Sequence, residues 1–539
     1  MSAARVLDST VERANLETIT VALRERFHGA VSIAESGVVG SVSCENLPAL
    51  PAICRFLFWE AGCSFGGLIV EEQKDHWDLR YLFLAPQAGW FEVLVKLPLE
   101  VTSIPSISPE VHAADWHERE AEDLFGLQFE KHPRLGDFIL HDQTWAEGLA
   151  PLRKNFDITK VHVNGQTNMD WRPLLVVRDP GAFAMPVGPV YEGGIGESVH
   201  FMLETVGEDV LRAVPRLFFN FRGVEKIAEG KNVGDVLLLA ERFAAKSSFA
   251  HSWAFCNAVE RLCGVAIPLR ATHLRIILGE LERVRHHTGA ITGICESTAL
   301  TVSASQAAII EEKLLRISCS FTGHRYLFGL NTPGGLRRDF TKQDFDNLLS
   351  GISEATDQLQ ILEERLSFTS SFLDRLEQVG VVDPKSARDL NLVGPVGRAS
   401  GRCHDLRREC PYGAYEELAF DVPRETEGDG YARLRILFQE AHQSARLIRQ
   451  AINRLEAGPV CAVCRPQHAG AALGWVEAPI GAAIHWIRLD ESGLVQRYRA
   501  ITPSFNNWMG FHAAVEDFAF QDFPIILATF GLSATECDR

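Results

Sequence analysis

The chain has 539 residues, of which 46% are hydrophobic and 23% are charged, as is ordinary for a globular protein. A chain of this length is too long for one hydrophobic core, so we expect at least two domains. Its net charge of −17 argues against a nucleic-acid partner, which needs a basic surface.

The sequence shows no sign of a membrane span or of an export signal. It contains no run of about eighteen apolar residues, and residues 1–10 lack the apolar core of a signal peptide. We therefore expect a cytoplasmic protein. Cys461 and Cys464 have the spacing of metal ligands, but a four-ligand site needs a second such pair, which the sequence lacks. The cysteines are predicted to be small buried hydrophobic residues.

The hydrophobic pattern predicts an α/β domain over residues 1–157. Helical spacing over residues 12–27 precedes strand-like stretches at 76–84 and 90–98. The polar, irregular segment 158–184 is predicted to be a linker.

A different pattern covers residues 185–539, where a short strand at 199–206 precedes long amphipathic helices. These helices are predicted at residues 271–288, 303–320, 345–379 and 432–455. A second β-rich stretch follows at 474–502. Because long amphipathic helices usually pack into a bundle, we predict an α+β chain in which a helical bundle with flanking β-structure follows the α/β domain.

Residues 116–126 (Trp-His-Glu-Arg-Glu-Ala-Glu-Asp-Leu-Phe-Gly) are dense in carboxylates. Paired carboxylates suit acid–base chemistry, but a capped helix in which Arg119 pairs with its acidic neighbours is the simpler interpretation. Together with His132-Pro133, Leu140-His-Asp142 and Pro151-Leu-Arg-Lys154, this segment resembles the C-type subunit of respiratory complex I. That resemblance implies a structural domain that carries no cofactor.

Residues 186–539 contain a second series of motifs. Among them are Phe221-Arg-Gly-Val-Glu-Lys226, Gly279-Glu-Leu-Glu-Arg283, Thr322-Gly-His-Arg325 and Gly334-Gly-Leu-Arg-Arg-Asp339. The series resembles the D-type subunit of complex I and, more closely, the large subunit of formate hydrogenlyase and hydrogenase-4, which are group 4 membrane-bound [NiFe]-hydrogenases. The fusion of a C-type with a D-type domain is typical of formate-hydrogenlyase-like proteins. The resemblance therefore implies a [NiFe]-hydrogenase-large-subunit-like fold over residues 185–539.

The hydrogenases of this family hold their metal with four thiolates from two Cys-x-x-Cys pairs. The resemblance places at these four positions Ala244, Ser247, Ser533 and Glu536, and Cys537 is one residue out of register. Because soft sulfur ligands hold nickel and iron in this way, we expect this chain to bind no metal or other cofactor of its own.

The quinone site of complex I is also altered. By the same resemblance its tyrosine position holds Ala245 and its histidine position holds Ile195. Tyr191 lies nearby in a glycine-rich loop and is a candidate quinone contact, with an ordinary loop aromatic as the alternative.

Five polar residues are the remaining site candidates. Lys246, His251 and Glu536 are predicted to line a polar cavity, because a buried Lys–Glu pair has coupled pKa values and can relay protons; a salt bridge that fills a vestigial hole is the alternative. Arg242 and Arg325 match arginines that in this family flank the proximal iron–sulfur cluster of the small subunit. Surface ion pairs are the alternative for both.

The resemblance implies a peripheral-arm subunit of a membrane-associated, complex-I-like or formate-hydrogenlyase-like oxidoreductase, held on the inner face of the membrane by its partners. The implied partners are membrane-arm subunits and a B-type small subunit with a [4Fe–4S] cluster. Three functions remain open. The chain handles quinone or protons in a remodelled cavity, or it is a non-catalytic scaffold or coupling subunit, or it is an active group 4 [NiFe]-hydrogenase large subunit, which the ligand positions disfavour.

Overall fold

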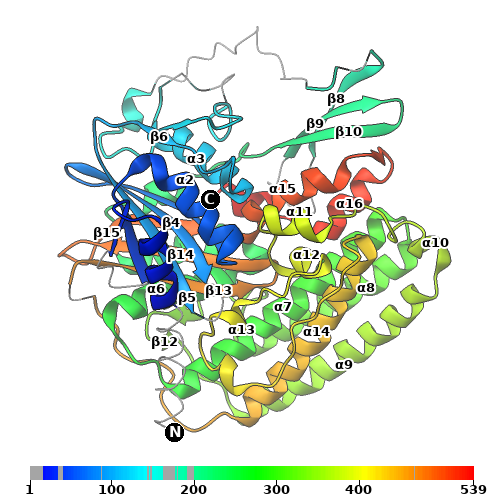
Figure 1. Ribbon diagram of the computed structural model, residues 1–539. Coiled ribbons are helices and arrows are strands. Elements are labelled where there is room, and N and C mark those ends of the chain that lie inside the picture. Colours follow the sequence, from blue (N-terminus) through cyan, green and yellow to red (C-terminus); the bar gives the residue numbers. More distant parts are fainter. Residues whose placement is uncertain are drawn as a thin grey trace. The chain divides into compact units, whose positions relative to one another are not determined.

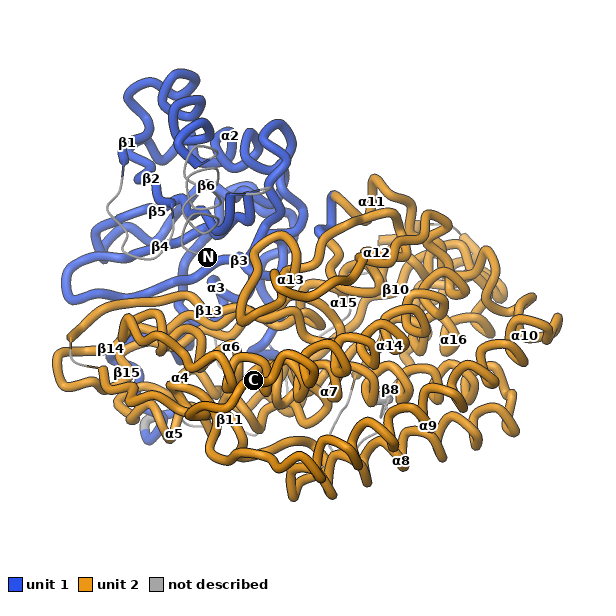
Figure 2. The backbone as a smooth tube through the Cα atoms, turned by 90° about the horizontal axis from the view of Figure 1, so that it is seen from below, with its two compact units in different colours: residues 1–174, 389–391 blue, residues 175–388, 392–539 orange. Residues whose placement is uncertain are grey.

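The computed structural model (Figure 1) describes residues 16–33, 40–85, 88–141, 145, 148–161, 176–178, 180–190, 199–466 and 468–539. The chain divides into two compact units (Figure 2), the first made of residues 1–174 and 389–391 and the second of residues 175–388 and 392–539. Both units combine helices with sheets, which confirms the predicted α+β class. Most of the predicted linker 158–184 lies outside the described residues.

The first unit is built on a five-stranded sheet with the order β1-β2-β5-β4-β3. Its strands are β1 (Val31–Ile33), β2 (Gly40–Cys44), β3 (Ser64–Glu72), β4 (His76–Ala85) and β5 (Gly89–Pro98). Strands β4 and β5 confirm the predicted strands, and residues 16–26 are helical within the predicted helix 12–27. Nearly every residue of β4 is buried, including Asp78 and Arg80, which pair with each other at 3.0 Å.

The acidic motif forms helix α3 (Asp115–Phe125), whose carboxylates bind the backbone of two loops. The buried Glu118 accepts a hydrogen bond of 2.8 Å from the Ile107 N–H and two more from the flanking serine hydroxyls. Asp123 accepts two from the N–H groups of residues 139–140, at 2.6 and 2.7 Å. Burial raises the pKa of Glu118 to about 7. The motif therefore fixes loops of the first unit.

Arg119 does not pair with the acidic residues beside it, contrary to prediction. Its guanidinium donates to the carbonyl oxygens of Gly136 and Asp137, at 3.3 and 3.4 Å, and lies 4.3 Å from the ring centre of Phe138. Neighbouring carboxylates are already bound to backbone N–H groups, so the arginine is left to bind carbonyl oxygens and an aromatic face.

The core of the second unit is a bundle of four long helices. They are α7 (Leu269–Ser297), α8 (Thr301–Thr322), α9 (Lys342–Ser367) and α14 (Gly430–Asn453). Helix α7 packs against both α8 and α14, and α9 packs against the same two helices, so all four lie side by side (Figure 1). Three of the predicted helices, 271–288, 303–320 and 432–455, are confirmed by α7, α8 and α14.

The fourth predicted helix, 345–379, is too long. Helix α9 ends at Ser367, and a short helix α10 (Ser370–Leu373) follows. Phe368 is 88% exposed, and the Thr369 hydroxyl donates to the carbonyl oxygen of Arg365 at 2.8 Å. Serine and threonine side chains that bind nearby backbone groups compete with helical hydrogen bonds, which explains the break.

Two sheets flank the bundle within the second unit. One has the order β16-β10-β9-β8, and the other has the order β13-β14-β15. Their strands are β8 (Ala182–Val190), β9 (Val199–Val206), β10 (Asp209–Arg216), β13 (Gly470–Ala478), β14 (Gly481–Leu489), β15 (Val495–Ile501) and β16 (Phe518–Ala519). Strand β9 confirms the predicted strand 199–206, and β13–β15 confirm the β-rich stretch 474–502.

Helix α6 (Ser248–Cys263) packs directly onto β13 and β14. At the crossing, a Cβ added to Gly474 would lie 2.1 Å from the carbonyl oxygen of Ala254 and 2.4 Å from the nitrogen of Ala258. Only glycine fits there. The N-terminus of α6 is fixed by Glu282 of α7, which accepts hydrogen bonds from the N–H groups of Phe249 and Ala250, at 2.8 and 3.0 Å. This packing positions the site described next.

Candidate functional site

Two segments far apart in the sequence meet at the start of α6. They are the one-turn helix at Ala245–Ser247 and the short helix α17 (Ala534–Cys537). Arg222 joins them, because its guanidinium donates to the carbonyl oxygen of Phe243 at 2.8 Å and to that of Thr535 at 2.6 Å. The arginine of the motif at 221–226 thus holds together the two segments that carry the four ligand-equivalent positions.

Glu536 is the centre of the site and is buried. Its carboxylate accepts a hydrogen bond of 2.5 Å from the Ser247 hydroxyl and one of 3.3 Å from the Ser504 N–H, and it lies 3.4 Å from Nε2 of His251. The Ser533 hydroxyl accepts from the Glu536 N–H at 3.4 Å and caps α17. Burial alone would raise the pKa of Glu536, but His251 and Ser247 bind the carboxylate and lower its pKa below the ordinary value.

From Glu536 a chain of buried side chains continues inward. Nδ1 of His251 lies 3.0 Å from Nε2 of His485 on β14, and Nδ1 of His485 lies 2.8 Å from the hydroxyl of Tyr498 on β15. Burial, together with the nearby His251, lowers the pKa of His485 well below its ordinary value, and burial raises the pKa of Tyr498 well above its own. At neutral pH both are therefore uncharged.

The C-terminal residue is held in a separate buried cluster. Glu225 of helix α4 (Val224–Ala228) pairs with Arg497 at 2.8 Å, with Arg499 at 3.1 Å and with Arg539 at 3.5 Å. Burial would raise the pKa of Glu225, but the three guanidinium groups hold it at about 2. The cluster anchors the segment that carries Glu536.

Lys246 is not brought to Glu536, so the predicted buried Lys–Glu pair is wrong. Among the residues that the structure describes, Lys246 makes no ion pair with Glu536, and its positive charge lies near Glu311 and His286 instead. A 3₁₀ turn has three residues per turn, so adjacent side chains point in different directions. Ser247 therefore faces Glu536 while the half-buried Lys246 faces α7 and α8.

Arg242 and Arg325 both lie at the surface of the second unit, with 59% and 42% of their side chains exposed. Arg325 pairs with Glu312 at 2.5 Å, and the Arg242 guanidinium lies 5.8 Å from the ring centre of Phe328. That ring stacks on His324, so residues 324–328 place the two arginines in one region. Tyr191 and Ile195 lie outside the described residues.

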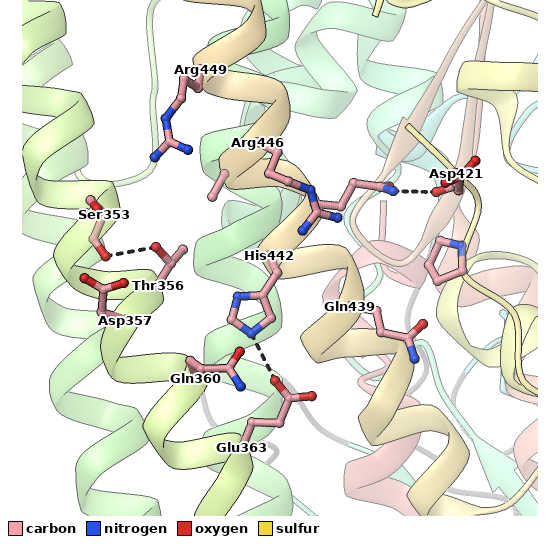
Figure 3. A pocket seen from close by; sticks show the side chains of 13 residues that line it. Ser353, Thr356, Asp357, Gln360, Glu363, Asp421, Gln439, His442, Arg446 and Arg449 are labelled. Atoms are coloured by element: carbon pink, nitrogen blue, oxygen red, sulfur yellow. Dashed lines mark hydrogen bonds and ion pairs between the residues drawn. The ribbon is translucent and has the colours of Figure 1, made fainter. Parts of the chain in front are cut away.

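A polar groove of about 830 Å³ lies elsewhere in the second unit, between α9 and α14 (Figure 3). Arg446 and Arg449 project into it from α14, and His442 pairs with Glu363 of α9 at 3.0 Å. The groove mixes acidic and basic side chains, and none of the predicted site residues lines it. The candidate site is therefore the cluster around Glu536.

Comparisons with known proteins agree with this division of the chain. Residues 46–162 match the family described as the 30 Kd subunit of respiratory-chain NADH dehydrogenase, and residues 300–469 match its 49 Kd subunit. The chain is 30% identical to formate hydrogenlyase subunit 5 of Escherichia coli over 501 residues, which cover 91% of this chain and 87% of that relative. The chain belongs to this family of fused C-type and D-type subunits.

Two further relatives are named as parts of hydrogenase-4 and of an NADH-quinone oxidoreductase. Hydrogenase-4 component G of Escherichia coli is 28% identical over 532 residues, which cover 97% of this chain and 92% of the relative. The C/D subunit of the NADH-quinone oxidoreductase of Bdellovibrio bacteriovorus is 32% identical over 369 residues, which cover 67% of this chain and 64% of the relative. These relatives are named as parts of larger enzymes.

The donor set at the four ligand-equivalent positions does not fit a nickel–iron centre. Ala244 has no side-chain donor atom, the Ser247 hydroxyl is hydrogen-bonded to the Glu536 carboxylate, and the Ser533 hydroxyl accepts from the Glu536 N–H. The Cys537 sulfur donates to the carbonyl oxygen of Ser533 at 3.7 Å. Nickel and iron in these enzymes need four soft thiolates, and hydroxyl groups with one carboxylate do not supply them.

Sequence reasoning missed two members of the chain of buried side chains. His485 and Tyr498 are not among the residues predicted from the sequence. The two strands pair with His485 opposite Ala500 and Ile487 opposite Tyr498, so the histidine and the tyrosine are diagonal neighbours across β14 and β15. The hairpin register is the signal that would have found them.

Proposed function

We propose that this chain is a peripheral-arm subunit of a membrane-associated, complex-I-like or formate-hydrogenlyase-like oxidoreductase, and that its buried site holds a proton in the place where hydrogenases hold their metal. The relatives support the first part, because they are named as parts of formate hydrogenlyase, hydrogenase-4 and NADH-quinone oxidoreductase. The described residues contain no helix with both the length and the apolar character to span a bilayer. Attachment to the cytoplasmic face is thus assigned to partner subunits.

One observation carries the second part: the line from Glu536 through His251 and His485 to Tyr498 is an unbroken series of hydrogen bonds. With His251 neutral, the Tyr498 hydroxyl donates to His485, His485 donates to His251, and His251 donates to the carboxylate. With His251 protonated, His251 donates at both nitrogens, and His485 in its other tautomer donates to the tyrosine oxygen. Uptake of one proton therefore preserves every hydrogen bond.

The electron partner is inferred from the surface arginines. Arg242 and Arg325 are exposed near residues 324–328, and fixed positive charge beside an iron–sulfur cluster raises its reduction potential. We propose that a B-type small subunit with a [4Fe–4S] cluster docks here and that two electrons pass from that cluster, one at a time, to a quinone. Protonated His251, with Glu536 as its counter-ion, supplies one of the two protons that the quinone takes up to become a quinol, and water supplies the other. Tyr191 remains a candidate quinone contact.

The test uses the complex purified through a tag on this chain. Dithionite-reduced methyl viologen supplies electrons, and reduction of decylubiquinone is followed optically. Replacing His251 by glutamine is expected to slow quinone reduction by about 100-fold, the usual contribution of a positioned acid–base group. His442→Gln is the matched control, because His442 lies in the groove between α9 and α14, and it should leave the rate unchanged.

Three results would contradict the proposal. Unchanged quinone reduction by the His251→Gln complex would favour a scaffold. Hydrogen evolution with stoichiometric nickel would identify an active hydrogenase. Purification without any iron–sulfur subunit would remove the assigned electron partner.

A further inference from the structure

Cys464 lies beside Cys263, which is not the other cysteine of its Cys-x-x-Cys motif. The Cys464 thiol lies close enough to the thiol of Cys263, at the C-terminal end of α6, for each to influence the pKa of the other. Both residues are half-buried and both pack against the same hydrophobic cluster of α5 (Val233–Arg242), α6, β14 and β15. Two free thiols 201 positions apart in the sequence are therefore neighbours on one hydrophobic cluster.

A glycine turn holds the Cys464 segment in this position. The carbonyl oxygen of Gly334 accepts from the Ala462 N–H at 2.9 Å, and the Leu336 N–H donates to the carbonyl oxygen of Val460 at 2.8 Å. A Cβ added to Gly334 would lie 2.1 Å from the carbonyl oxygen of Ala462. The close approach requires glycine and fixes the segment that leads to Cys464.

The glycine turn is in turn anchored to α6. Glu260, one turn before Cys263, accepts a 2.8 Å hydrogen bond from the Gly334 N–H and pairs at 2.7 Å with the buried Arg275. Arg275 also donates to the carbonyl oxygen of Gly335 at 2.9 Å. One buried ion pair thus ties the turn to α6, so the two thiols are held together by the fold around them.

Cys461 is not placed to be the partner of Cys464, although the two share a Cys-x-x-Cys motif. Its backbone pairs with Gly335, its exposed thiol donates to the carbonyl oxygen of Ala462 at 3.4 Å, and this pairing fixes its direction. Within the described part of the chain no three His, Cys, Asp or Glu side chains are arranged to hold a metal. The contact therefore favours a thiol pair over a metal site.

We propose that Cys263 and Cys464 form a reversible disulfide, a modification site at the end of α6 opposite to His251. The oxidant is a low-molecular-weight disulfide such as oxidised glutathione. One cysteine thiolate attacks it and releases one glutathione, and the second cysteine displaces the other, so two thiols lose two protons and two electrons and two glutathione molecules are formed. Twelve residues of helix separate His251 from Cys263, about 18 Å, so the bond forms without contact with the proton-holding site.

The reaction should be slow at neutral pH. Burial raises the pKa of Cys464 to about 12 and also raises that of Cys263, and the thiolate is the attacking form. The rate of bond formation is therefore expected to rise about tenfold for each pH unit between pH 7 and 9.

The experiment maps the bond in the full chain within its purified complex. The protein is incubated with oxidised glutathione at pH 8.5, free thiols are blocked with N-ethylmaleimide, and tryptic peptides are analysed by mass spectrometry with and without dithiothreitol. Cleavage after arginine releases Cys263 in residues 262–270 and Cys464 in residues 455–488, because trypsin does not cut the Arg465–Pro466 bond; the second peptide also contains Cys461. A dithiothreitol-sensitive link between these peptides is the expected product, and fragmentation should assign it to Cys464.

Cys461→Ser is the matched control and should leave the link intact, whereas Cys464→Ser should abolish it. A bond within the 455–488 peptide, a glutathione adduct confined to Cys461, or no link after a day at pH 8.5 would each overturn the proposal. Stoichiometric zinc bound by the three cysteines would overturn it as well. The decisive measurement is made on the unsubstituted chain, so it does not depend on whether either variant folds.

Discussion

Arg398 is a buried residue that binds three carboxylates at once. Its guanidinium lies 2.7 Å from Glu440 on α14, 2.9 Å from Glu477 on β13 and 3.6 Å from Asp405. It belongs to the short helix α12 (Gly394–Ala399), so the ion network connects three parts of the second unit. Replacing Arg398 by methionine keeps an unbranched, flexible apolar stem and removes the guanidinium group with its charge.

The stability lost in the Arg398→Met protein depends on which partners the three carboxylates keep. In the Arg398→Met protein, Asp405 and Glu440 each keep another partner, but the Glu477 carboxylate keeps only the Leu406 N–H, at 3.1 Å, among the described residues. Breaking a buried pair by removing one side costs about 3–5 kcal/mol. For a unit of this size that is a fall of about 4–7 °C in the thermal midpoint.

The loss of stability caused by Arg398→Met should grow as the pH rises. Burial and the nearby Asp405 raise the pKa of Glu477 to about 7 in the folded protein. An acid whose folded pKa is raised loses stability as pH rises from its unfolded pKa to its folded pKa, here from about 4.5 to about 7. Without Arg398 the folded pKa rises further, so the decline continues above pH 7 at about 1.4 kcal/mol per pH unit. The deficit should be larger at pH 8.5 than at pH 6.5.

Thermal unfolding followed by tryptophan fluorescence at both pH values measures this difference. Arg433→Met is the matched control, because the buried Arg433 binds the carbonyl oxygens of Gly380 and Gly428 and the Thr529 hydroxyl. Burial lowers the pKa of Arg433 to about 9, which is still above both test values, so its deficit should change little between pH 6.5 and pH 8.5. Equal deficits at the two pH values for Arg398→Met would refute the assignment of Glu477 as the orphaned group.

Three further outcomes are expected. Gly474→Ala forces a Cβ against the backbone of α6 and should lower the stability of the second unit by about 1–3 kcal/mol or more, whereas Gly458→Ala, which meets no atom within 4 Å, should not change the thermal midpoint. Glu225→Gln leaves three buried arginines without their carboxylate and should speed hydrogen exchange at residues 534–539 at pH 7; because the pKa of Glu225 is about 2, this difference should shrink as pH falls below about 4.5. Glu118→Gln removes a group whose folded pKa is about 7, so its thermal midpoint relative to the unsubstituted chain should rise between pH 5 and pH 8.

Long elements were predictable because a single periodic pattern specifies each of them. The stripes of α7, α8 and α14 extend over many turns, and tertiary packing uses the same faces that the sequence displays. The 345–379 helix failed at Thr369, where a local side-chain hydrogen bond competes with the helix. The hydrophobic periodicity does not reveal a break caused by one such residue, because the apolar residues that follow it keep the same helical spacing.

The sequence predicts which chain segments form the site, but it does not predict the directions of all their side chains. Family motifs identified Ser247, His251 and Glu536, and the structure brings these three together. The direction of Lys246 depends on a single 3₁₀ turn, and the place of Tyr498 depends on the register of one hairpin. Neither feature produces a periodic pattern in the sequence, because each depends on local geometry that the surrounding fold determines.

The chemistry of Glu536 bears on the choice between a proton-holding site and a filled cavity. A buried, ionised carboxylate is expensive unless hydrogen bonds compensate it, and an apolar side chain of similar volume fills the same space at lower cost. Here the compensation comes from the Ser247 hydroxyl, the Ser504 N–H and a histidine whose second nitrogen leads into further hydrogen bonds. A cavity filler needs the first two donors at most. The third partner, His251, adds a side chain that can bind and release a proton, and it is this addition that favours proton handling over a purely structural role.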